Sequence, residues 1–481
     1  MHGRAATKLV CTIGPASEAR IPELLEAGMS VARLNLAHGS SAEHAARVAA
    51  IRDAARVAGC EVAILADLPG PKVRLGPLAG GTVDLAAGAA FRLLGGADVT
   101  HEGDATGAST THPGLASDLR PGDHIQLADG AVELVVTAVE GATVLTTVEH
   151  AGTLRSRVGV NVPAERLSLP ALAEHDLELA RLAVDTGIDL LGQSFVRTLR
   201  DVEDLRSVIG PGGPAIVAKI ETRPAVDGFE AIAAAADGVM VARGDLGLEL
   251  PFEDVPMVQK RLVAMARSMG RPVIVATQML ESMLTAARPT RAEASDVANA
   301  VLDGADAVML SGETAIGTFP VLAARAALRI AASAEAGAPP LLSGADAGGV
   351  GAGSRAQVSL AIAAAALAAS DDEVTVLVAA GRTPAGAVAA AAQRPGVPIL
   401  AVVPNARVAR VLLVVRGVWP VVPSDPASAA DPGAVSAAAL LRDPAVLAML
   451  PERGRAVVVA GADGGGAERI EVLAVRAAPG P

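Results

Sequence analysis

The stretch Val217–Leu250, VAKIETRPAVDGFEAIAAAADGVMVARGDLGLEL, decides the fold. Its pattern is typical of a strand, a helix, a second strand and a glycine-containing turn. Lys219 and Glu221 lie two residues apart on the first strand, so both side chains point to one face. Asp245 follows the end of the second strand. The three residues therefore lie at the carboxyl ends of successive strands, where parallel α/β proteins build active sites.

This combination of charges indicates a chemistry. Two carboxylates, Glu221 and Asp245, are ligands that suit a hard divalent cation, and Lys219 adds a positive charge beside them. Chemistry on a phosphorylated substrate needs both features. The alternative for the Lys219–Glu221 pair is a salt bridge on the rim of the sheet, because such surface pairs are common and weak.

Short apolar strands recur along the chain, each ending in a polar or glycine cluster, with helical stretches between them. Strand–helix alternation predicts a parallel sheet, and eight such units predict a closed (β/α)8 barrel in an α/β protein. The expected strands are Lys8–Gly14, Val31–His38, Val62–Asp67, Asp189–Phe195, Ala215–Glu221, Gly238–Asp245, Pro272–Gln278 and Ala307–Glu313.

The alternation breaks between the third and fourth strands. Residues 71–160 contain short apolar runs separated by Gly and Asp turns, a pattern that predicts a small inserted β-barrel domain. This insert leaves and returns at the carboxyl ends of the strands. We therefore expect it to act as a lid that excludes water from the site.

A third domain follows the barrel. The Gly-, Pro- and Ala-rich stretch Ala336–Ser354 predicts a linker, and strand–helix alternation resumes after it. The tract Ser424–Ala438 is rich in Asp, Pro, Ala and Ser and is expected to be a loop. The predicted division is a barrel domain at 1–70 and 161–336, a β lid at 71–160, and a C-terminal α/β regulatory-type domain at 337–481.

The composition excludes several classes of function. The 481 residues are 51% hydrophobic but only 1% aromatic, so Ala, Val, Leu and Ile must build the core. The net charge of −12 argues against a nucleic-acid partner. Mean hydropathy is +0.43, but the most apolar window, Ala356–Ala369, is too short to span a membrane. Two cysteines form no disulfide framework, and we expect a cytoplasmic protein.

Seven segments in this order resemble the signatures of the pyruvate kinase family: TKLVCTIGPAS, VARLNLAHG, DLPGPKVR, VAKIET, MVARGDLG, ATQMLESM and RPTRAEASDVANAVLDGADAVMLSGETA. The resemblance covers the barrel and is weaker in the lid and the C-terminal domain. It implies the last step of glycolysis, in which phosphoenolpyruvate transfers its phosphoryl group to ADP and gives pyruvate and ATP. It also implies a homotetramer.

The resemblance assigns roles to residues of the stretch Val217–Leu250 and to Thr277. Glu221 and Asp245 would hold Mg²⁺, with Mn²⁺ as an alternative ion, and Lys219 would stabilise the transferring phosphoryl group. Gly244 and Asp245 would bind the substrate carboxylate through the turn that opens a helix. Thr277 would lie near the substrate carboxylate and the path of the proton. Its alternative is a strand threonine whose hydroxyl is satisfied by its own backbone.

Other roles follow from the same resemblance. Ser311 and Glu313 would assist the proton path through water. Arg33 would be catalytic and bind the substrate phosphate, and Asn35, His38 and Arg74 would surround the nucleotide phosphates. For His38 the alternative is a packed or solvated loop histidine.

The chain departs from the family at the position of the K⁺ ion. The K⁺-dependent form holds the ion with Asn, Ser, Asp and Thr; here Asn35 and Asp67 remain, but the other positions are Ala37 and Leu68. Lys72 lies where that form carries Glu. We expect Lys72 to act as an internal cation in place of K⁺, so that K⁺ is not required. The alternative is that Lys72 points into solvent.

The effector loop of the C-terminal domain also departs from the family, because Val378–Thr383 reads VAAGRT and offers few hydroxyl groups to a phosphate. We expect a weak response to sugar phosphates or none.

Two other functions fit parts of the sequence. A metal-dependent lyase or aldolase acting on phosphoenolpyruvate or pyruvate would share the barrel, the Mg²⁺ and the enolate, but it would need neither the lid nor the nucleotide residues. A non-catalytic regulatory paralogue would have lost Lys219, Glu221 or Asp245, and all three are present.

Overall fold

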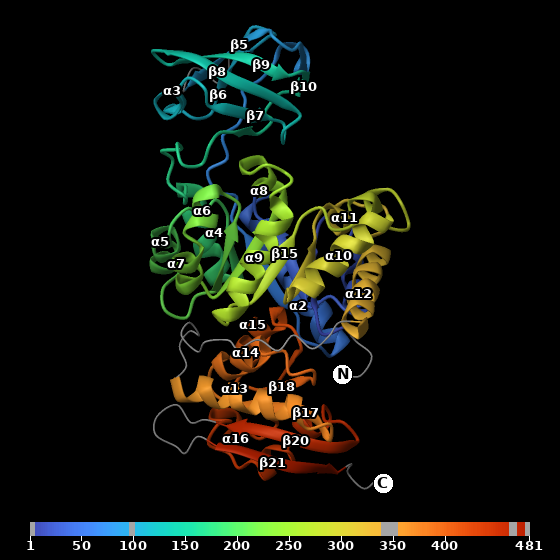
Figure 1. The fold of residues 1–481 in the computed structure, drawn as a ribbon. Coiled ribbons are helices and arrows are strands. Elements are labelled where there is room, and N and C mark those ends of the chain that lie inside the picture. Colours follow the sequence, from blue (N-terminus) through green and yellow to red (C-terminus); the bar gives the residue numbers. More distant parts are fainter. Residues whose placement is uncertain (1–4, 96–101, 338–354, 461–468, 477–481) are drawn as a thin grey trace.

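A computed structural model describes residues 5–95, 102–337, 355–460 and 469–476. Three parts lie one above another in Figure 1: a β-rich lid, a central barrel and a C-terminal α/β domain. The predicted linker lies mostly at 338–354 and therefore outside the described residues. The exact domain boundaries stay a prediction.

The central part is a closed barrel of eight parallel strands, which confirms the predicted fold class. Around the barrel the order is β1 (Lys8–Thr12), β2 (Val31–Asn35), β3 (Ala63–Asp67), β12 (Leu190–Gln193), β13 (Ala215–Ile220), β14 (Gly238–Ala242), β15 (Val273–Ala276) and β16 (Ala307–Leu310). These strands coincide with the eight expected ones but most end earlier. Glu221, Asp245, Thr277, Ser311 and Glu313 therefore lie just beyond strand ends.

Helices surround this barrel, and local sequence fixes where the main ones begin and end. Ser40 and Glu43 form a capping box at the start of α2, and Thr290 and Glu293 form one at the start of α10. Gly59 ends α2 in a left-handed conformation. The helices are α1 (Ile21–Ala27), α2 (Ser41–Ala58), α4 (Glu174–Asp185), α5 (Leu199–Ile209), α6 (Arg223–Asp227), α7 (Phe229–Ala235), α8 (Arg243–Glu249), α9 (Val255–Ser268), α10 (Arg291–Asp303), α11 (Gly312–Ala315) and α12 (Pro320–Gly337).

The barrel core consists of small and branched aliphatic side chains, as the composition predicts. Strands β1, β3 and β14 are buried along their whole length. In the described part of the chain, only Phe91 in the lid and Phe229 in α7 are aromatic among the largest fully buried side chains. A continuous aliphatic core of this kind is typical of strands that are covered on both faces.

The lid is almost entirely β-structure. Its strands are β4 (Thr82–Leu85), β5 (Ala90–Gly95), β6 (Gly107–Thr110), β7 (His124–Leu127), β8 (Val132–Glu140), β9 (Thr143–His150), β10 (Gly152–Arg155) and β11 (Val160–Asn161), with one short helix, α3 (Leu115–Asp118). Among the described residues, these strands form a six-stranded and a two-stranded sheet, so the inserted β lid is present as predicted. Phe91 and Leu93 lie in their common core.

The C-terminal domain is a five-stranded sheet in the order β19-β18-β17-β20-β21, in which only β21 is antiparallel. Its elements are α13 (Arg355–Ser370), β17 (Val374–Ala380), α14 (Ala385–Ala392), β18 (Ile399–Val402), α15 (Ala406–Val411), β19 (Val418–Val421), α16 (Pro426–Ala430), α17 (Ala437–Leu440), α18 (Pro444–Leu447), β20 (Arg453–Ala460) and β21 (Arg469–Arg476). The expectation that Ser424–Ala438 is a loop was wrong in part, because Asp425 and Ser436 cap the short helices α16 and α17.

No helix among the described residues combines the length and the apolar character that crossing a bilayer requires.

A buried ion-pair network joins the barrel floor to the C-terminal domain. Asp189, which precedes β12, is 1% exposed. Its carboxylate accepts hydrogen bonds from Arg52 in α2 at 2.6 Å and from Arg410 in α15 at 2.7 Å. The backbone amide of Ile64 donates a third bond at 2.8 Å. One carboxylate thus holds two cations from two domains.

Replacing Asp189 tests how much this network contributes to the stability of the protein. Asp189→Asn removes the charge and leaves two guanidinium groups without their carboxylate, so we expect a loss of about 3 kcal/mol in the free energy of unfolding, measured from urea denaturation. Glu61→Gln is the matched control, because this 47% exposed carboxylate lies 3.4 Å from Arg410 and should change stability by less than about 1 kcal/mol. Equal effects of the two substitutions would contradict the assignment.

Candidate active site

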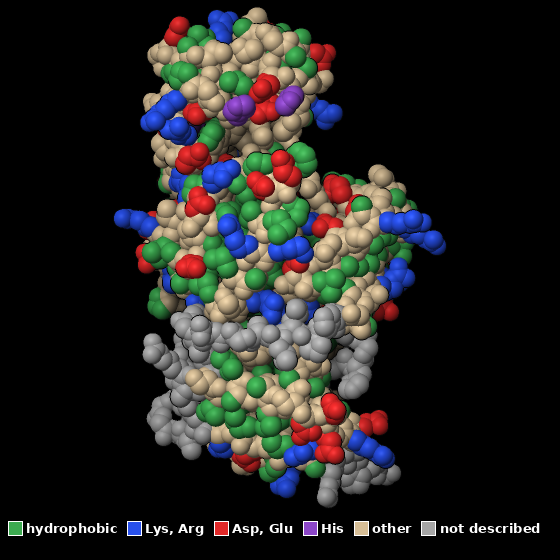
Figure 2. Space-filling model, viewed as in Figure 1, with side chains coloured by type: hydrophobic (Ala, Val, Ile, Leu, Met, Phe, Trp, Pro, Cys, Tyr) green, Lys and Arg blue, Asp and Glu red, His purple; other side chains and the backbone are tan. Residues whose placement is uncertain are grey.

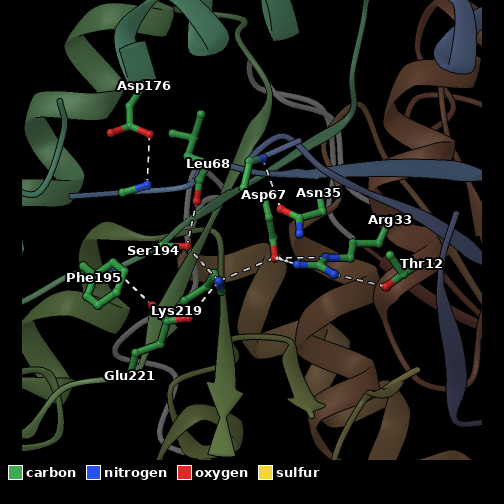
Figure 3. A network of polar contacts seen from close by, with 12 residues as sticks. Thr12, Arg33, Asn35, Asp67, Leu68, Asp176, Ser194, Phe195, Lys219 and Glu221 are labelled. Carbon is green, nitrogen blue, oxygen red and sulfur yellow. Dashed lines mark hydrogen bonds and ion pairs between the residues drawn. The ribbon is translucent and has the colours of Figure 1, made fainter. Parts of the chain in front are cut away.

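Lys219 is the centre of a buried polar network at the carboxyl ends of the barrel strands (Figure 3). Its Nζ lies 2.7 Å from Glu221 Oε1 and 3.5 Å from Asp67 Oδ2. It also donates a hydrogen bond of 2.7 Å to Ser194 Oγ, whose hydroxyl donates to the Leu68 carbonyl at 2.7 Å. Lys219 is 8% exposed. The predicted proximity of Lys219 and Glu221 is present, and the pair is buried and not on an exposed rim.

The two carboxylates keep Lys219 charged. Burial acts to lower the pKa of the Lys219 ammonium, but Asp67 and Glu221 outweigh burial and raise that pKa above its ordinary value. Burial likewise acts to raise the pKa of Asp67, and Lys219 and Arg33 lower it below its ordinary value. The network therefore holds fixed charges inside the barrel mouth.

Arg33 from β2 joins this network through Asp67. Its Nε and Nη2 donate to Asp67 Oδ2 at 3.0 and 2.8 Å. Its Nη1 donates to Thr12 Oγ1 at 3.2 Å. Arg33 and Lys219 thus share one carboxylate, which places two cations on the same side of the site.

Glu221 and Asp245 suit a divalent cation. Burial raises the pKa of the Glu221 carboxyl, Lys219 opposes the shift and the nearby Asp245 adds to it. Glu221 Oε2 accepts a hydrogen bond from the Phe195 amide at 2.9 Å, which fixes its orientation. Both carboxylates line one narrow cavity at the foot of the lid. Two acidic side chains that repel each other in a cavity are a donor set that fits Mg²⁺ or Mn²⁺.

Lys72 lines the same cavity, at the first turn of the lid segment. Lys72 is exposed, which agrees with the alternative that it points into solvent. It nevertheless lines the same cavity as Glu221 and Asp245. Gly70 lies two residues before it with a φ of +68°, and a Cβ there would lie 2.7 Å from the Phe195 ring. Asp176 accepts a hydrogen bond from the Gly70 amide at 3.0 Å. The exit of the chain toward the lid is therefore tightly fixed.

Gly244 and Thr277 contact each other directly. The Gly244 amide in α8 donates to Thr277 Oγ1 at 2.8 Å. Thr277 Oγ1 in turn donates to the Ala276 carbonyl at 2.6 Å. In this structure the Thr277 hydroxyl is therefore hydrogen-bonded to backbone groups, as in the alternative to a catalytic role. The Gly244 amide, expected to bind a substrate carboxylate, is occupied by the same threonine.

Ser311 and Glu313 follow β16 and lie together. Glu313 is fully buried, and its two oxygens accept hydrogen bonds from the amides of Leu280 at 2.9 Å and Ser311 at 2.7 Å. This carboxylate ties the loop after β15 to the end of β16. Its contacts are those of a structural group that shapes the site.

The expected nucleotide residues are dispersed. Asn35 Oδ1 accepts from the Ala37 amide at 3.2 Å, and His38 is exposed. Arg74 Nη1 donates to the Arg157 carbonyl at 3.3 Å, at the base of the lid. No contact among the described residues joins these three side chains directly.

Sequence reasoning missed two residues of the site. Ser194 follows β12 and holds the Lys219 ammonium; its signal was a polar residue at the carboxyl end of a barrel strand. Arg243 opens α8, and its Nη2 donates to the carbonyls of Thr277 at 2.6 Å and Gln278 at 3.2 Å. Its Nη1 lies 2.7 Å from Asp296. Both carbonyls belong to residues with positive φ, +70° and +53°.

Comparisons with known proteins agree with this geometry. The family profile described as the barrel domain of pyruvate kinase matches residues 4–324, and the profile of its alpha/beta domain matches residues 360–475. A pyruvate kinase of Mycobacterium intracellulare is 50% identical over 341 residues, which cover 69% of this chain and 72% of that protein. One of Staphylococcus saprophyticus is 41% identical over 429 residues, 86% of this chain and 71% of that protein.

A solved structure gives the same result for the fold. The crystal structure of a pyruvate kinase from Cryptosporidium parvum superposes with a TM-score of 0.88 at 32% identity, covering 98% of this chain and 96% of that one. Fold and sequence together define a phosphotransferase enzyme built on a (β/α)8 barrel. The chain belongs to the pyruvate kinase family.

Replacing Arg243 tests whether its hydrogen bonds position the turn that carries Thr277. A left-handed backbone at a β-branched residue such as Thr277 is strained, at a cost of about 1–3 kcal/mol. Arg243→Lys cannot bond both carbonyls and Asp296 at once. We expect kcat of the pyruvate kinase reaction to fall by about tenfold or more, an increase of about 1.4 kcal/mol in the barrier. Steady-state kinetics with phosphoenolpyruvate and ADP measure this change.

Arg200→Lys is the control, because the Arg200 side chain is 85% exposed on α5. If Arg243→Lys keeps kcat within twofold of the control, Arg243 does not position the Thr277 turn for catalysis.

Proposed function

We propose that this enzyme transfers the phosphoryl group of phosphoenolpyruvate to ADP with Mg²⁺ as cofactor, and that it does so without K⁺. The observation that carries the proposal is the buried contact of 2.7 Å between Lys219 Nζ and Glu221 Oε1. It joins a fixed positive charge to a carboxylate that shares a cavity with Asp245. The family supplies the reaction, in which the P–O bond to the enol oxygen breaks and one to an ADP phosphate oxygen forms.

Glu221 and Asp245 would hold the metal ion. Mg²⁺, or Mn²⁺ in its place, would neutralise charge on the phosphate and enolate oxygens when bound. Glu221 contributes an oxygen whose orientation the Phe195 amide fixes. Lys219 lies on the other side of Glu221 and balances its charge.

Lys219 and Arg33 would bind the phosphoryl group as it moves. Phosphoryl transfer depends mostly on positioning and electrostatic stabilisation, so fixed cations are the main contribution of the protein. Asp67 holds both cations in place. Neither needs to reorganise when the substrate enters.

The carbon end of the substrate would lie by Gly244 and Thr277. For the amides of the α8 turn to bind the carboxylate, Thr277 Oγ1 must release the Gly244 amide and turn toward the substrate. Thr277 would then lie on the route by which a proton reaches the enolate methylene carbon. Ser311 would order water on this route, and Glu313 would hold the loop that carries Ser311.

ADP would bind between the barrel and the lid. Asn35, His38 and Arg74 are the proposed phosphate contacts, and lid closure would bring them together and exclude water.

We also propose the division into three domains: a barrel at 1–70 with 161–336, a lid at 71–160 and a C-terminal domain at 337–481. A cytoplasmic location and a homotetramer also belong to this proposal. The homotetramer is supported by two exposed apolar side chains, Phe252 (83%) just before α9 and Met257 (67%) in α9.

A coupled assay for pyruvate tests the proposed chemistry. With phosphoenolpyruvate, ADP and Mg²⁺ the protein should produce pyruvate and ATP, and no pyruvate should form when ADP is omitted. Lys219→Met keeps an unbranched side chain one atom shorter and removes the charge, so we expect the rate to fall by about 10³-fold or more. Pyruvate formation without ADP would indicate a lyase, and an unchanged rate in Lys219→Met would overturn the role of Lys219.

Independence from K⁺ is supported by the residue types at the positions of the K⁺ site. Asn35 Oδ1 accepts from the Ala37 amide, and Asp67 Oδ2 binds Arg33 and Lys219, while Asp67 Oδ1 has no hydrogen-bond partner among the described residues. Ala37 and Leu68 have no side-chain oxygen. Lys72, at the edge of the metal cavity, would supply the missing charge.

Titration with K⁺ tests this part. In a tetramethylammonium buffer the wild-type rate should rise less than twofold when K⁺ is added. Lys72→Gln should lower the rate by about tenfold, or about 1.4 kcal/mol, and K⁺ should not restore it. Lys72→Arg keeps the charge and should retain most of the activity. Strong activation of the wild type by K⁺ would refute K⁺ independence.

A further inference from the structure

Two histidines and two glutamates gather on the sheet of the lid, and none of the four has a role in the proposed reaction. Glu133 in β8 lies between them: its Oε1 is 2.9 Å from His124 Nδ1, and its Oε2 is 2.6 Å from His150 Nδ1. Glu149 Oε2 lies 3.4 Å from His124 Nδ1. Figure 2 shows histidine side chains beside carboxylates on this face of the lid.

Strand pairing explains why these four side chains meet. His150 in β9 lies directly opposite Glu133 in β8. His124 in β7 lies opposite Val135, which is two residues from Glu133 and therefore on the same face. The clustering thus follows from the register of three adjacent strands, and not from the chance meeting of flexible loops.

A β-bulge adds the fourth side chain. The pairing of β8 with β9 passes from Glu133–His150 to Leu134–Val148, so Glu149 is an extra residue without an opposite partner. In a regular strand Glu149 and His150 would point to opposite faces, but a bulge redirects one of them. It thereby allows two consecutive residues to present ligand atoms at one site.

The donor atoms suit a borderline divalent cation. One ligand atom from each of His124, Glu133 and Glu149 lies within 4.8 Å of the others. Neutral imidazole nitrogens and carboxylate oxygens together are ligands of Zn²⁺, whereas Mg²⁺ prefers oxygens alone. Two carboxylates also supply the negative charge that would balance a divalent ion.

The central ligand is the best fixed of the four. The Glu133 side chain is 19% exposed, whereas His124 is 54% and His150 is 70% exposed. The cluster therefore has a half-buried carboxylate at its centre and imidazoles at its solvent side. An ion can enter from solvent without any movement of the barrel.

We propose that the lid sheet binds one Zn²⁺ ion, or a similar transition-metal ion, through His124, Glu133 and Glu149, with His150 paired to the second oxygen of Glu133. This site is separate from the cavity of Glu221 and Asp245 and needs no substrate. It does not rest on the proposed phosphoryl transfer.

Metal titration of the full chain tests the site. Co²⁺ serves as a spectroscopic probe and Zn²⁺ as its competitor, with Mg²⁺ in excess to fill oxygen-only sites. We expect one Co²⁺ per chain with visible absorption bands of mixed nitrogen and oxygen ligation, displaced by Zn²⁺. Glu133→Gln and His124→Ala should each weaken Zn²⁺ binding at least tenfold, which is about 1.4 kcal/mol.

His175→Ala is the matched control, because His175 is a 65% exposed histidine that lies 3.5 Å from a single glutamate, Glu178. Its Zn²⁺ affinity should equal that of the wild type. Circular dichroism of each variant checks the fold, and activity with Mg²⁺ should be unchanged in both lid variants. Equal Zn²⁺ binding in all variants, or no Zn²⁺ binding in the wild type, would overturn the proposal and leave ordinary His–Glu ion pairs.

Discussion

The buried ammonium of Lys219 is the feature on which the rest of the site depends. A lone charge inside a barrel would be unstable, and Asp67 and Glu221 make it tolerable by lying 3.5 and 2.7 Å away. Both partners also act elsewhere in the site, since Asp67 holds Arg33 and Glu221 faces the cavity shared with Asp245. One balance of charges therefore fixes the positions of two cations and of the carboxylates proposed to hold the metal.

Backbone strain at the ends of barrel strands accompanies this arrangement. Phe195, Thr277 and Gln278 follow barrel strands with φ between +53° and +70°, a region that residues with a Cβ adopt rarely. Contacts offset the strain of each turn, because the Phe195 amide donates to Glu221 and Arg243 bonds the carbonyls of Thr277 and Gln278. Strain held by surrounding contacts is typical of functional sites, where it aims groups that a regular strand would point elsewhere.

Much of this could be predicted from the sequence, and particular residues show where prediction ended. The eight barrel strands follow from apolar runs with polar ends, and the meeting of Lys219 with Glu221 follows from their spacing on one strand. Ser194 and Arg243 could not be assigned, because their partners are backbone carbonyls and side chains distant in the sequence. For the lid, turns predict strands, but the order in which the strands pair depends on long-range packing and was not predicted.

The most direct test of the central claim is an anomalous difference map from crystals grown with Mn²⁺ and phosphoenolpyruvate. The balance around Lys219 predicts one strong peak between the carboxylates of Glu221 and Asp245, close to the roughly 2.0–2.1 Å that Mg²⁺ keeps from its oxygen ligands. The Lys219 ammonium should lie on the phosphate side of that peak. A peak elsewhere, or a Lys219 side chain turned out of the cavity, would contradict the account.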